Sequence, residues 1–328
     1  MERTVIKIEN EILDNTVTMS SDIGFGQTKS AFMLDGKVQE IIFKSNIAVG
    51  ESLLGQDNFI VDGVNYYFTE EANEIVSTGD TTKDSDLHRI LLYRAMYLVA
   101  KKLKKTNVNF KLMLTCPLYS YKSDRGAKQL KSLTSKKKGI KVDDGVNVYT
   151  FNIVDVDITS ETIAACFALP VKVANIREDK LVLCDIGNKN ISIVGVDGKP
   201  DVEGSTATTT GVDHLKNRLV EIAKANPSWK MQSARDIERY LKNADDKTIN
   251  EKIFEVLNSD AFDEVDVIMK KQGSEARGAK LLFLGGGSIL LEQFIKQKWN
   301  TNNVIFVPNG ATATVRGALA RALKKFKL

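Results

Sequence analysis

Asp22–Lys29 (DIGFGQTK) and Asp185–Asn190 (DIGNKN) are two similar glycine turns, and each follows a run of residues typical of a β-strand. A third glycine cluster, Gly285–Gly287, follows another such run later in the chain and precedes a helix predicted over Ile289–Lys298. Glycine lets backbone amides approach a phosphate closely, and an aspartate ahead of the turn can hold the metal ion that accompanies the phosphate. The repeated aspartate-x-glycine opening therefore predicts a nucleotide held between two related halves of the chain.

Composition favours a soluble protein of the cytoplasm. The chain has 328 residues, enough for two domains, and its net charge of +4 does not argue for nucleic acid. Lysine clusters such as Lys136–Lys138 are interpreted as solvated helix ends, with contact to DNA or protein as the alternative. No apolar run approaches the roughly 18 residues of a membrane span, and an odd number of cysteines (three) is typical of a reducing compartment. We expect no direct contact with nucleic acid or membrane.

Strand-like and helical patterns alternate along the chain, which predicts an α/β protein. After the first turn come two hairpin signals, Asp35-Gly36 and Asp62-Gly63, and after the second turn comes Asp197-Gly198. The first strand pairs are therefore antiparallel, unlike the Rossmann pattern, in which the glycine turn opens a helix at once. The sequence predicts an internal repeat in arrangement.

These patterns divide the chain into an N-terminal extension and two domains. Residues 1–15 precede the fold. Domain I covers residues 16–174 and is completed by a closing helix within 308–328. Domain II covers 175–307 and contains a mostly helical insertion at about 214–278.

The order of motifs resembles the superfamily of actin, sugar kinases and heat-shock chaperone ATPases. Asp22–Lys29 resembles its first phosphate motif, Asp185–Asn190 the second, and Leu284–Ile289 the adenosine motif. The resemblance implies an actin-like (ribonuclease H-like) fold, with two related α/β domains around a nucleotide cleft. Within the superfamily, the stretch Leu112–Leu118 (LMLTCPL) is most similar to bacterial plasmid-segregation actins of the ParM type. It is followed by a basic helix, predicted over Lys122–Lys138, and by a hairpin.

The resemblance also implies roles for single residues. Asp22 and Asp185 orient Mg²⁺, largely through its waters, since magnesium dehydrates reluctantly. Glu161, with Asp185, is the catalytic candidate, because it would position or deprotonate the attacking water; a helix-capping glutamate is the alternative. The implied nucleotide-binding residues are Gly24, Phe25, Gly26, Gln27, Thr28, Lys29, Gly187, Asn188, Lys189, Asn190, Gly211, Asp213, Gly285, Gly286 and Gly287.

Two departures from the superfamily pattern concern the phosphate motifs. Phe25 stands where a small hydroxyl residue is common, and Lys189, Asn190 and Ser192 stand where threonine hydroxyls and often a later aspartate are usual. These departures bear on the rate of hydrolysis more than on binding, and Lys189 is expected to offset phosphate charge.

The expected function is that of a filament-forming ATPase. The resemblance implies that the chain binds ATP or GTP with Mg²⁺, hydrolyses it, and assembles with itself into helical filaments. These would segregate plasmid DNA through a DNA-binding adaptor on the plasmid centromere. One alternative is a nucleotide-binding scaffold with little turnover, suggested by the altered second motif. The other is a small-molecule kinase on the same fold. Such a kinase would need a catalytic carboxylate facing a substrate pocket, and no feature of the sequence marks one.

Overall fold

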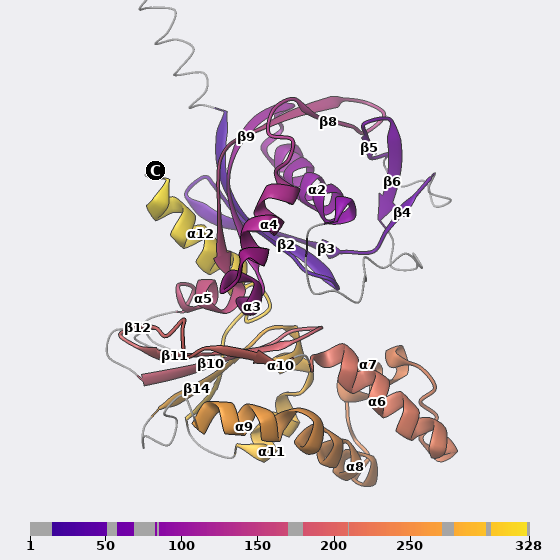
Figure 1. The fold of residues 1–328 in the computed structure, drawn as a ribbon. Helices are drawn as coiled ribbons and strands as arrows, with labels where there is room; N and C mark the ends of the chain where they lie inside the picture. Colours follow the sequence, from indigo (N-terminus) through magenta and orange to yellow (C-terminus); the bar gives the residue numbers. More distant parts are fainter. Residues whose placement is uncertain are drawn as a thin grey trace, which may run out of the picture. The chain divides into compact units, whose positions relative to one another are not determined.

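The computed structural model describes residues 15–50, 58–68, 83, 85–169, 180–208, 210–270, 279–299 and 303–326, which form two compact units (Figure 1). Unit 1 comprises Met1–Ala168 and Thr314–Leu328, and unit 2 comprises Leu169–Ala313. The predicted N-terminal extension, residues 1–15, lies outside the described residues except for Asn15. None of the described helices has both the length and the apolar character needed to cross a membrane.

The described strands of unit 1 form one nine-stranded sheet. In spatial order they are β3 (Lys37–Lys44), β2 (Gln27–Leu34), β1 (Thr16–Ile23), β7 (Asn107–Cys116), β9 (Val148–Ser160), β8 (Ile140–Asp143), β5 (Ile60–Val61), β6 (Val64–Phe68) and β4 (Ile47–Val49). β1 pairs antiparallel with β2 and parallel with β7, and β7 pairs parallel with β9. The ends of β1, β7 and β9 therefore meet at one edge of the sheet.

Helices cover both faces of this sheet because successive side chains of a strand point to opposite faces. The described helices of unit 1 are α2 (Asp86–Leu103), α3 (Leu118–Tyr121), α4 (Asp124–Leu133), α5 (Glu161–Cys166) and α12 (Ala313–Lys325). Met19 of β1 belongs to the same buried cluster as α2. Its neighbour Ser20 faces α12 instead, and its hydroxyl donates a hydrogen bond to Val315 O at 2.6 Å.

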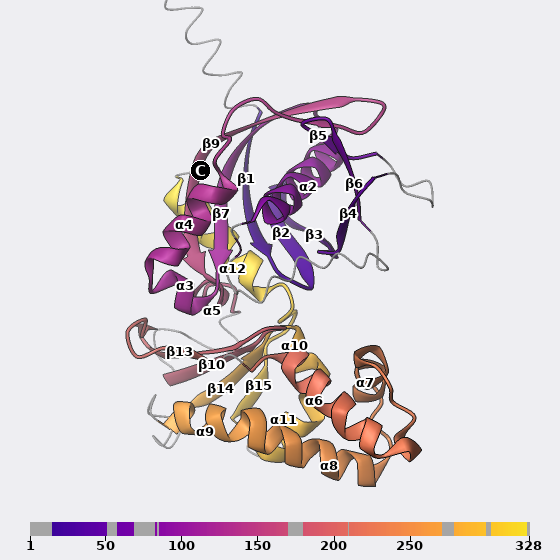
Figure 2. The ribbon, with the colours of Figure 1, turned by 45° about the vertical axis from the view of Figure 1, so that its right-hand side comes forward.

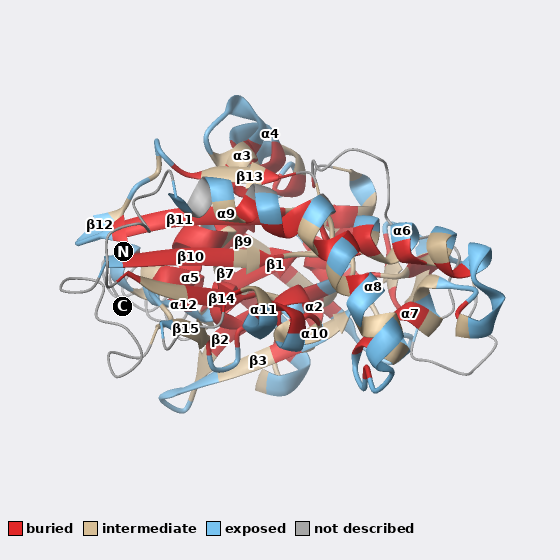
Figure 3. Cartoon of the chain, turned by 90° about the horizontal axis from the view of Figure 1, so that it is seen from below, coloured by how far each residue is buried: buried red, intermediate tan, exposed pale blue. Residues whose placement is uncertain are grey.

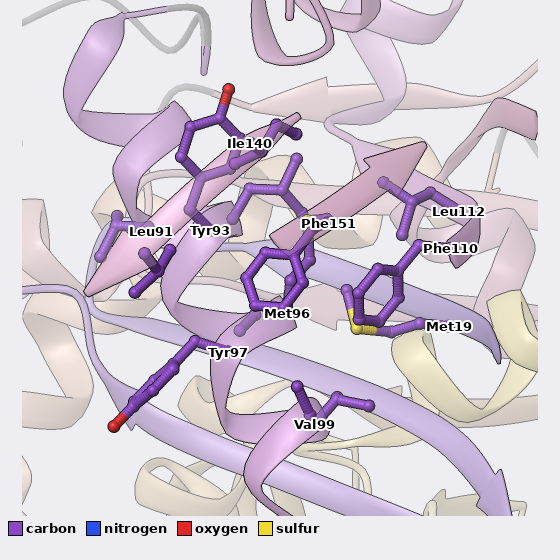
Figure 4. Packing of buried hydrophobic residues seen from close by; sticks show 14 of the residues in the cluster. Met19, Leu91, Tyr93, Met96, Tyr97, Val99, Phe110, Leu112, Ile140 and Phe151 are labelled. Atoms are coloured by element: carbon purple, nitrogen blue, oxygen red, sulfur yellow. The ribbon is translucent and has the colours of Figure 1, made fainter. Parts of the chain in front are cut away.

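The core beneath α2 is rich in aromatic side chains (Figure 4). Tyr97 and Tyr149 meet edge to face with ring centroids 5.0 Å apart, and so do Phe110 and Phe151 at 5.6 Å. Burying each such side chain contributes about 1.5–3 kcal/mol to folding. α2 begins at Ser85, whose hydroxyl accepts a hydrogen bond from His88 N.

Unit 2 repeats the central strand order of unit 1. Its sheet runs β12 (Lys199–Pro200), β11 (Ile191–Asp197), β10 (Lys180–Ile186), β14 (Lys280–Leu284) and β15 (Val304–Phe306), with β13 (Thr206–Thr208) also paired to β11. β10 pairs antiparallel with β11 and parallel with β14, as β1 does with β2 and β7. This matching order confirms the predicted internal repeat. β1, β7, β10 and β14 are largely buried (Figure 3).

As well as the sheet, the described residues of unit 2 form α-helices. They are α6 (Val212–Ala225), α7 (Ala234–Leu241), α8 (Lys247–Leu257), α9 (Asp263–Met269), α10 (Gly286–Leu290) and α11 (Glu292–Lys298). α8 and α9 are joined by a π-helical turn, and together they form a long rod (Figure 2). The rod is anchored by Phe262, whose ring lies 5.1 Å from that of Trp299, and Trp299 in turn lies 5.3 Å from Phe283 of β14.

Local predictions succeeded where the turn chemistry is explicit. Asp35 and Asp62 both have positive φ, as the Asp-Gly hairpins require. Two helix boundaries were wrong. The helix predicted over Lys122–Lys138 ends at Leu133, because the following segment is held against β9 by a hydrogen bond from Ile153 N to Lys137 O (2.7 Å). The helix predicted to begin at Ile289 begins at Gly286.

Candidate functional site

The two glycine turns have the same backbone closure. Gly24 N donates to Gln27 O at 3.1 Å, and Gly187 N donates to Asn190 O at 2.9 Å. Each turn connects two antiparallel strands. In both units, the last paired residues of the two strands lie immediately before and after the turn. A Cβ on Gly24 would lie 2.5 Å from Gln27 O, so this closure requires glycine there. Each turn thus follows, at the same offset, an aspartate at the end of the unit's central strand.

Unit 1 places Asp22 and Glu161 on either side of a buried lysine. Lys83 Nζ lies 2.9 Å from Asp22 Oδ1 and 2.5 Å from Glu161 Oε1, and the Lys83 side chain is only 4% exposed. The hydroxyl of Thr115 on β7 donates a further hydrogen bond to Asp22 Oδ1 at 3.1 Å. Asp22 and Thr115 lie near the ends of parallel neighbours, and Glu161 begins α5 directly after β9. The carboxylates and the threonine hydroxyl of the cluster therefore come together at the edge where these neighbouring strands end.

Lys83 was not predicted from the sequence. Asp22 and Glu161 stand in recognisable motifs, whereas Lys83 precedes the helix cap Ser85 and belongs to no motif. Its only sequence signal is a lysine ahead of a helix start, which is common on protein surfaces.

The pKa values of the two carboxyl groups in the cluster are shifted in opposite directions. Burial raises the pKa of Asp22, but Lys83 and Lys29 oppose it, and the net pKa lies below the usual range. Burial also raises the pKa of Glu161, Lys83 lowers it and Asp22 raises it, and here the net pKa is raised. The pKa of Lys83 is lowered by burial but raised more strongly by the two acids, so its net pKa is raised and it stays charged. Asp22 is thus the firmly ionised acid, and Glu161 has the greater proton affinity.

Other predicted residues of the first turn hold it in place. The hydroxyls of Thr28 and Ser45 lie 3.0 Å apart, and Ser45 Oγ donates to Gly24 O at 2.5 Å while its amide donates to Gly26 O. Phe25 is buried edge to face against His88. The unusual phenylalanine therefore anchors the turn to α2. Lys29 lies opposite Asp22 across the β1–β2 pair.

In unit 2 the second turn is fastened to the start of α6. Asn188 Nδ2 donates to Asp213 Oδ2 at 2.8 Å, and Lys189 Nζ lies 3.1 Å from the same oxygen. Lys216 pairs with the other oxygen of Asp213 at 3.4 Å. A Cβ on Gly211 would lie 2.5 Å from Asn188 O, so glycine is needed where α6 meets the turn. Asn190 Nδ2 donates to Ser192 Oγ at 3.2 Å.

The triple glycine lies beside the same turn. Gly285 has φ +85°, and a Cβ there would overlap the Asp185 carboxylate and lie 2.5 Å from Ile186 O. A Cβ on Gly287 would lie 2.5 Å from side-chain carbons of Ile186 and Val212. Gly286 differs, because it is exposed and a Cβ there would meet nothing within 4 Å. Unit 2 thus brings Asp185, the second turn, the start of α6 and the triple glycine together.

Comparison with known proteins identifies the fold. The model of the family described as Actin like proteins N terminal domain matches residues 20–163. The solved structure of Ta0583, an archaeal actin homolog, has a TM-score of 0.73 at 19% identity and covers 94% of this chain and 99% of its own. Bacillus thuringiensis ParM with ATP has a TM-score of 0.67 at 16% identity, covering 96% and 100%. The Alp12 filament structure has 0.66 at 20%, covering 95% and 99%.

No curated protein sequence matches the chain. The chain has the actin-like fold, and its first unit contains the match to the N-terminal domain of actin-like proteins. The resemblance in fold to actin-like proteins, ParM among them, is confirmed, as is the α/β fold class.

Proposed function

We propose that the chain is a filament-forming ATPase that binds ATP, or GTP, with Mg²⁺. The observation that carries this proposal is the pair of identically closed turns, each following an aspartate at the end of a central strand in an actin-like fold. Bacillus thuringiensis ParM with ATP shares the fold, which supports a nucleotide as the ligand. Glycine backbone in both turns suits phosphate, because amides can approach it closely.

Asp22 in unit 1 and Asp185 in unit 2 are the proposed magnesium residues. Among the described residues, no three His, Cys, Asp or Glu side chains gather into a metal site of their own. Magnesium typically keeps several waters and uses one or two carboxylates together with substrate phosphates, so these two aspartates fit it. The depressed pKa of Asp22 keeps its carboxylate ionised for that role. When bound, the ion would neutralise charge on the phosphates.

Glu161 is the proposed catalytic residue. Its carboxylate lies at the same sheet edge as Asp22, and its raised pKa makes it a better proton acceptor than an ordinary glutamate. Lys83 fixes one of its oxygens in place. These features support a role in orienting and deprotonating the attacking water. Asp185 is the second catalytic candidate, through the magnesium ion.

The remaining nucleotide contacts are proposed from where the residues lie within each unit. The exposed backbone at Gly286 is the surface offered to the base and ribose, and the start of α6, with Asp213, lies beside the neighbouring Gly287. Lys29 and Lys189 would offset phosphate charge. Thr28 and Phe25 would act by supporting the first turn.

We propose that binding of the nucleotide drives copies of this chain to assemble with one another. The Alp12 filament structure shares the fold, which supports a helical filament as the assembly. Repeated contact between unlike faces produces such a filament when it does not close into a ring. We infer that the filament segregates plasmid DNA through a DNA-binding adaptor, without direct contact between this chain and DNA. The three free thiols, Cys116, Cys166 and Cys184, fit the reducing cytoplasm as its place of action.

One experiment tests these proposals together. Purified protein is mixed with ATP or GTP and MgCl₂, and light scattering, pelleting and phosphate release are followed in the same reaction. Wild type should form polymer and then release phosphate. Glu161→Gln should form polymer that persists, with phosphate release lowered by roughly a hundredfold or more. Glu251→Gln, the same change at an exposed position of α8, should behave as wild type.

Other outcomes would favour other functions. A scaffold with little turnover is the second candidate, because the second turn is tied to Asp213 through Asn188 and Lys189. Nucleotide binding without polymer or phosphate release would favour it. Phosphorylation of a sugar in a coupled assay would instead identify a kinase. Full phosphate release by Glu161→Gln would show that Glu161 is not catalytic.

A further inference from the structure

Lys83 is unusual because it is a charged side chain almost wholly removed from solvent. The residue is 3% exposed, and its ammonium contacts two carboxylates, Asp22 at 2.9 Å and Glu161 at 2.5 Å. A buried ammonium is costly unless it is paired and hydrogen-bonded. The same is true of two carboxylates that share one site. The three groups therefore depend on one another: the lysine neutralises one of two negative charges that would otherwise face each other.

The position of the ammonium matters as much as its charge. It lies against Asp22 Oδ1, which also accepts a hydrogen bond from Thr115. A carboxylate oxygen of this kind is the ligand that a hard divalent cation or its coordinated water prefers. Lys83 thus already provides a positive charge at the aspartate for which a magnesium role is proposed above.

We propose that Lys83 is a built-in counter-cation that balances the Asp22–Glu161 pair and competes with a divalent ion for Asp22. On this account Asp22 exchanges Lys83 for the ion, while Lys83 keeps its contact with Glu161. The inference rests on the proposed function only in taking a divalent ion as the partner of Asp22. It has two consequences: Lys83 stabilises the protein when no divalent ion is present, and it weakens the binding of that ion.

The test uses the full chain without nucleotide, so its outcome does not depend on turnover or polymer. Thermal unfolding of wild type and Lys83→Met is measured in EDTA and across a MgCl₂ series. Methionine keeps much of the length of lysine and removes the charge. We expect Lys83→Met to unfold at a lower temperature in EDTA. Magnesium should restore it, with an apparent dissociation constant at least about tenfold lower than that of wild type.

Two further variants separate charge balance from simple loss of packing. Lys136→Met changes a half-exposed lysine of the same unit that pairs with Asp62, and it should show the wild-type magnesium response. The double variant Lys83→Met with Glu161→Gln removes one positive and one negative charge, so it should be more stable in EDTA than Lys83→Met alone. If Lys83→Met does not fold, the double variant still decides the matter, because it should fold.

Three results would overturn the proposal. The first is an unchanged unfolding temperature of Lys83→Met in EDTA together with an unchanged magnesium response. The second is a loss of stability that magnesium does not restore, which would make Lys83 a packing residue only. The third is a double variant no more stable than Lys83→Met. By contrast, a failure of the proposed ATPase function would appear as absent nucleotide binding, which none of these measurements uses.

Discussion

At the scale of single residues, a substitution at Gly286 tests the proposed role of the triple glycine in binding apart from its contribution to protein stability. A Cβ on Gly286 meets no protein atom within 4 Å, so Gly286→Ala should change the free energy of unfolding by less than about 0.5 kcal/mol. Gly285 has φ +85° and lies against Asp185, so Gly285→Ala should cost roughly 1–3 kcal/mol. If nucleotide lies on the exposed backbone, Gly286→Ala should weaken its binding all the same.

Chemical denaturation and titration with a fluorescent nucleotide analogue measure the two effects. A Gly286→Ala variant that is stable and binds nucleotide as wild type does would show that the ligand lies elsewhere. A variant as unstable as Gly285→Ala would contradict the geometry itself.

The candidate site could be predicted only in part from single residues. Asp22 was proposed from the glycine turn that follows it, and Glu161 from the resemblance of the segment after its strand to the actin-like superfamily. Lys83 was missed because its partners lie 61 and 78 positions away in the chain, and no local pattern marks it. Ser45 was missed for the same reason: it supports the first turn from 21 residues beyond Gly24.

At the scale of elements, the close contact of α12 with α5 depends on one glycine. A Cβ on Gly317 would overlap Ala164 O and come within 3.1 Å of Ala168 N. Glycine to alanine in a helix normally stabilises by about 0.5–1 kcal/mol, since glycine has the greater backbone entropy to lose. Here the sign should reverse, and Gly317→Ala should destabilise the protein by about 1–3 kcal/mol.

Urea denaturation of Gly317→Ala measures this reversal. Ala320→Ser on the exposed side of the same helix is the control, and it should change stability by less than about 0.5 kcal/mol. A Gly317→Ala protein at least as stable as wild type would show that the two helices do not pack this closely.

Helices and strands could be predicted from the sequence where the residues of a turn determine where they begin and end. They were harder to predict where contacts with residues distant in the sequence determine their ends. Asp35-Gly36 and Asp62-Gly63 fixed their hairpins because both residues of each turn have positive φ. The end of α4 was not readable, because Lys136–Lys138 continue a helix-compatible pattern while a hydrogen bond from β9 holds that segment. A contact between strand and loop distant in sequence overrode local propensity.

At the scale of the whole molecule, the chain contains one arrangement twice. The strand orders β3-β2-β1-β7-β9 and β12-β11-β10-β14-β15 correspond strand for strand, with the glycine turn in the same place. This repetition made the fold class readable from the sequence, because two weak signals at equivalent places support each other. The strands that extend the sheet of unit 1, β8, β5, β6 and β4, have no counterpart among the strands that the structure describes in unit 2.

The central proposal is that Asp22 and Asp185 both take part in binding one Mg²⁺-nucleotide, and calorimetric titration tests it most directly. The account predicts that wild type binds one Mg²⁺-ATP, or Mg²⁺-GTP, per chain. Asp22→Asn and Asp185→Asn should each weaken that binding by at least about tenfold, since each removes a charge-assisted contact. Wild-type affinity in either variant, or two nucleotides bound per chain, would contradict it.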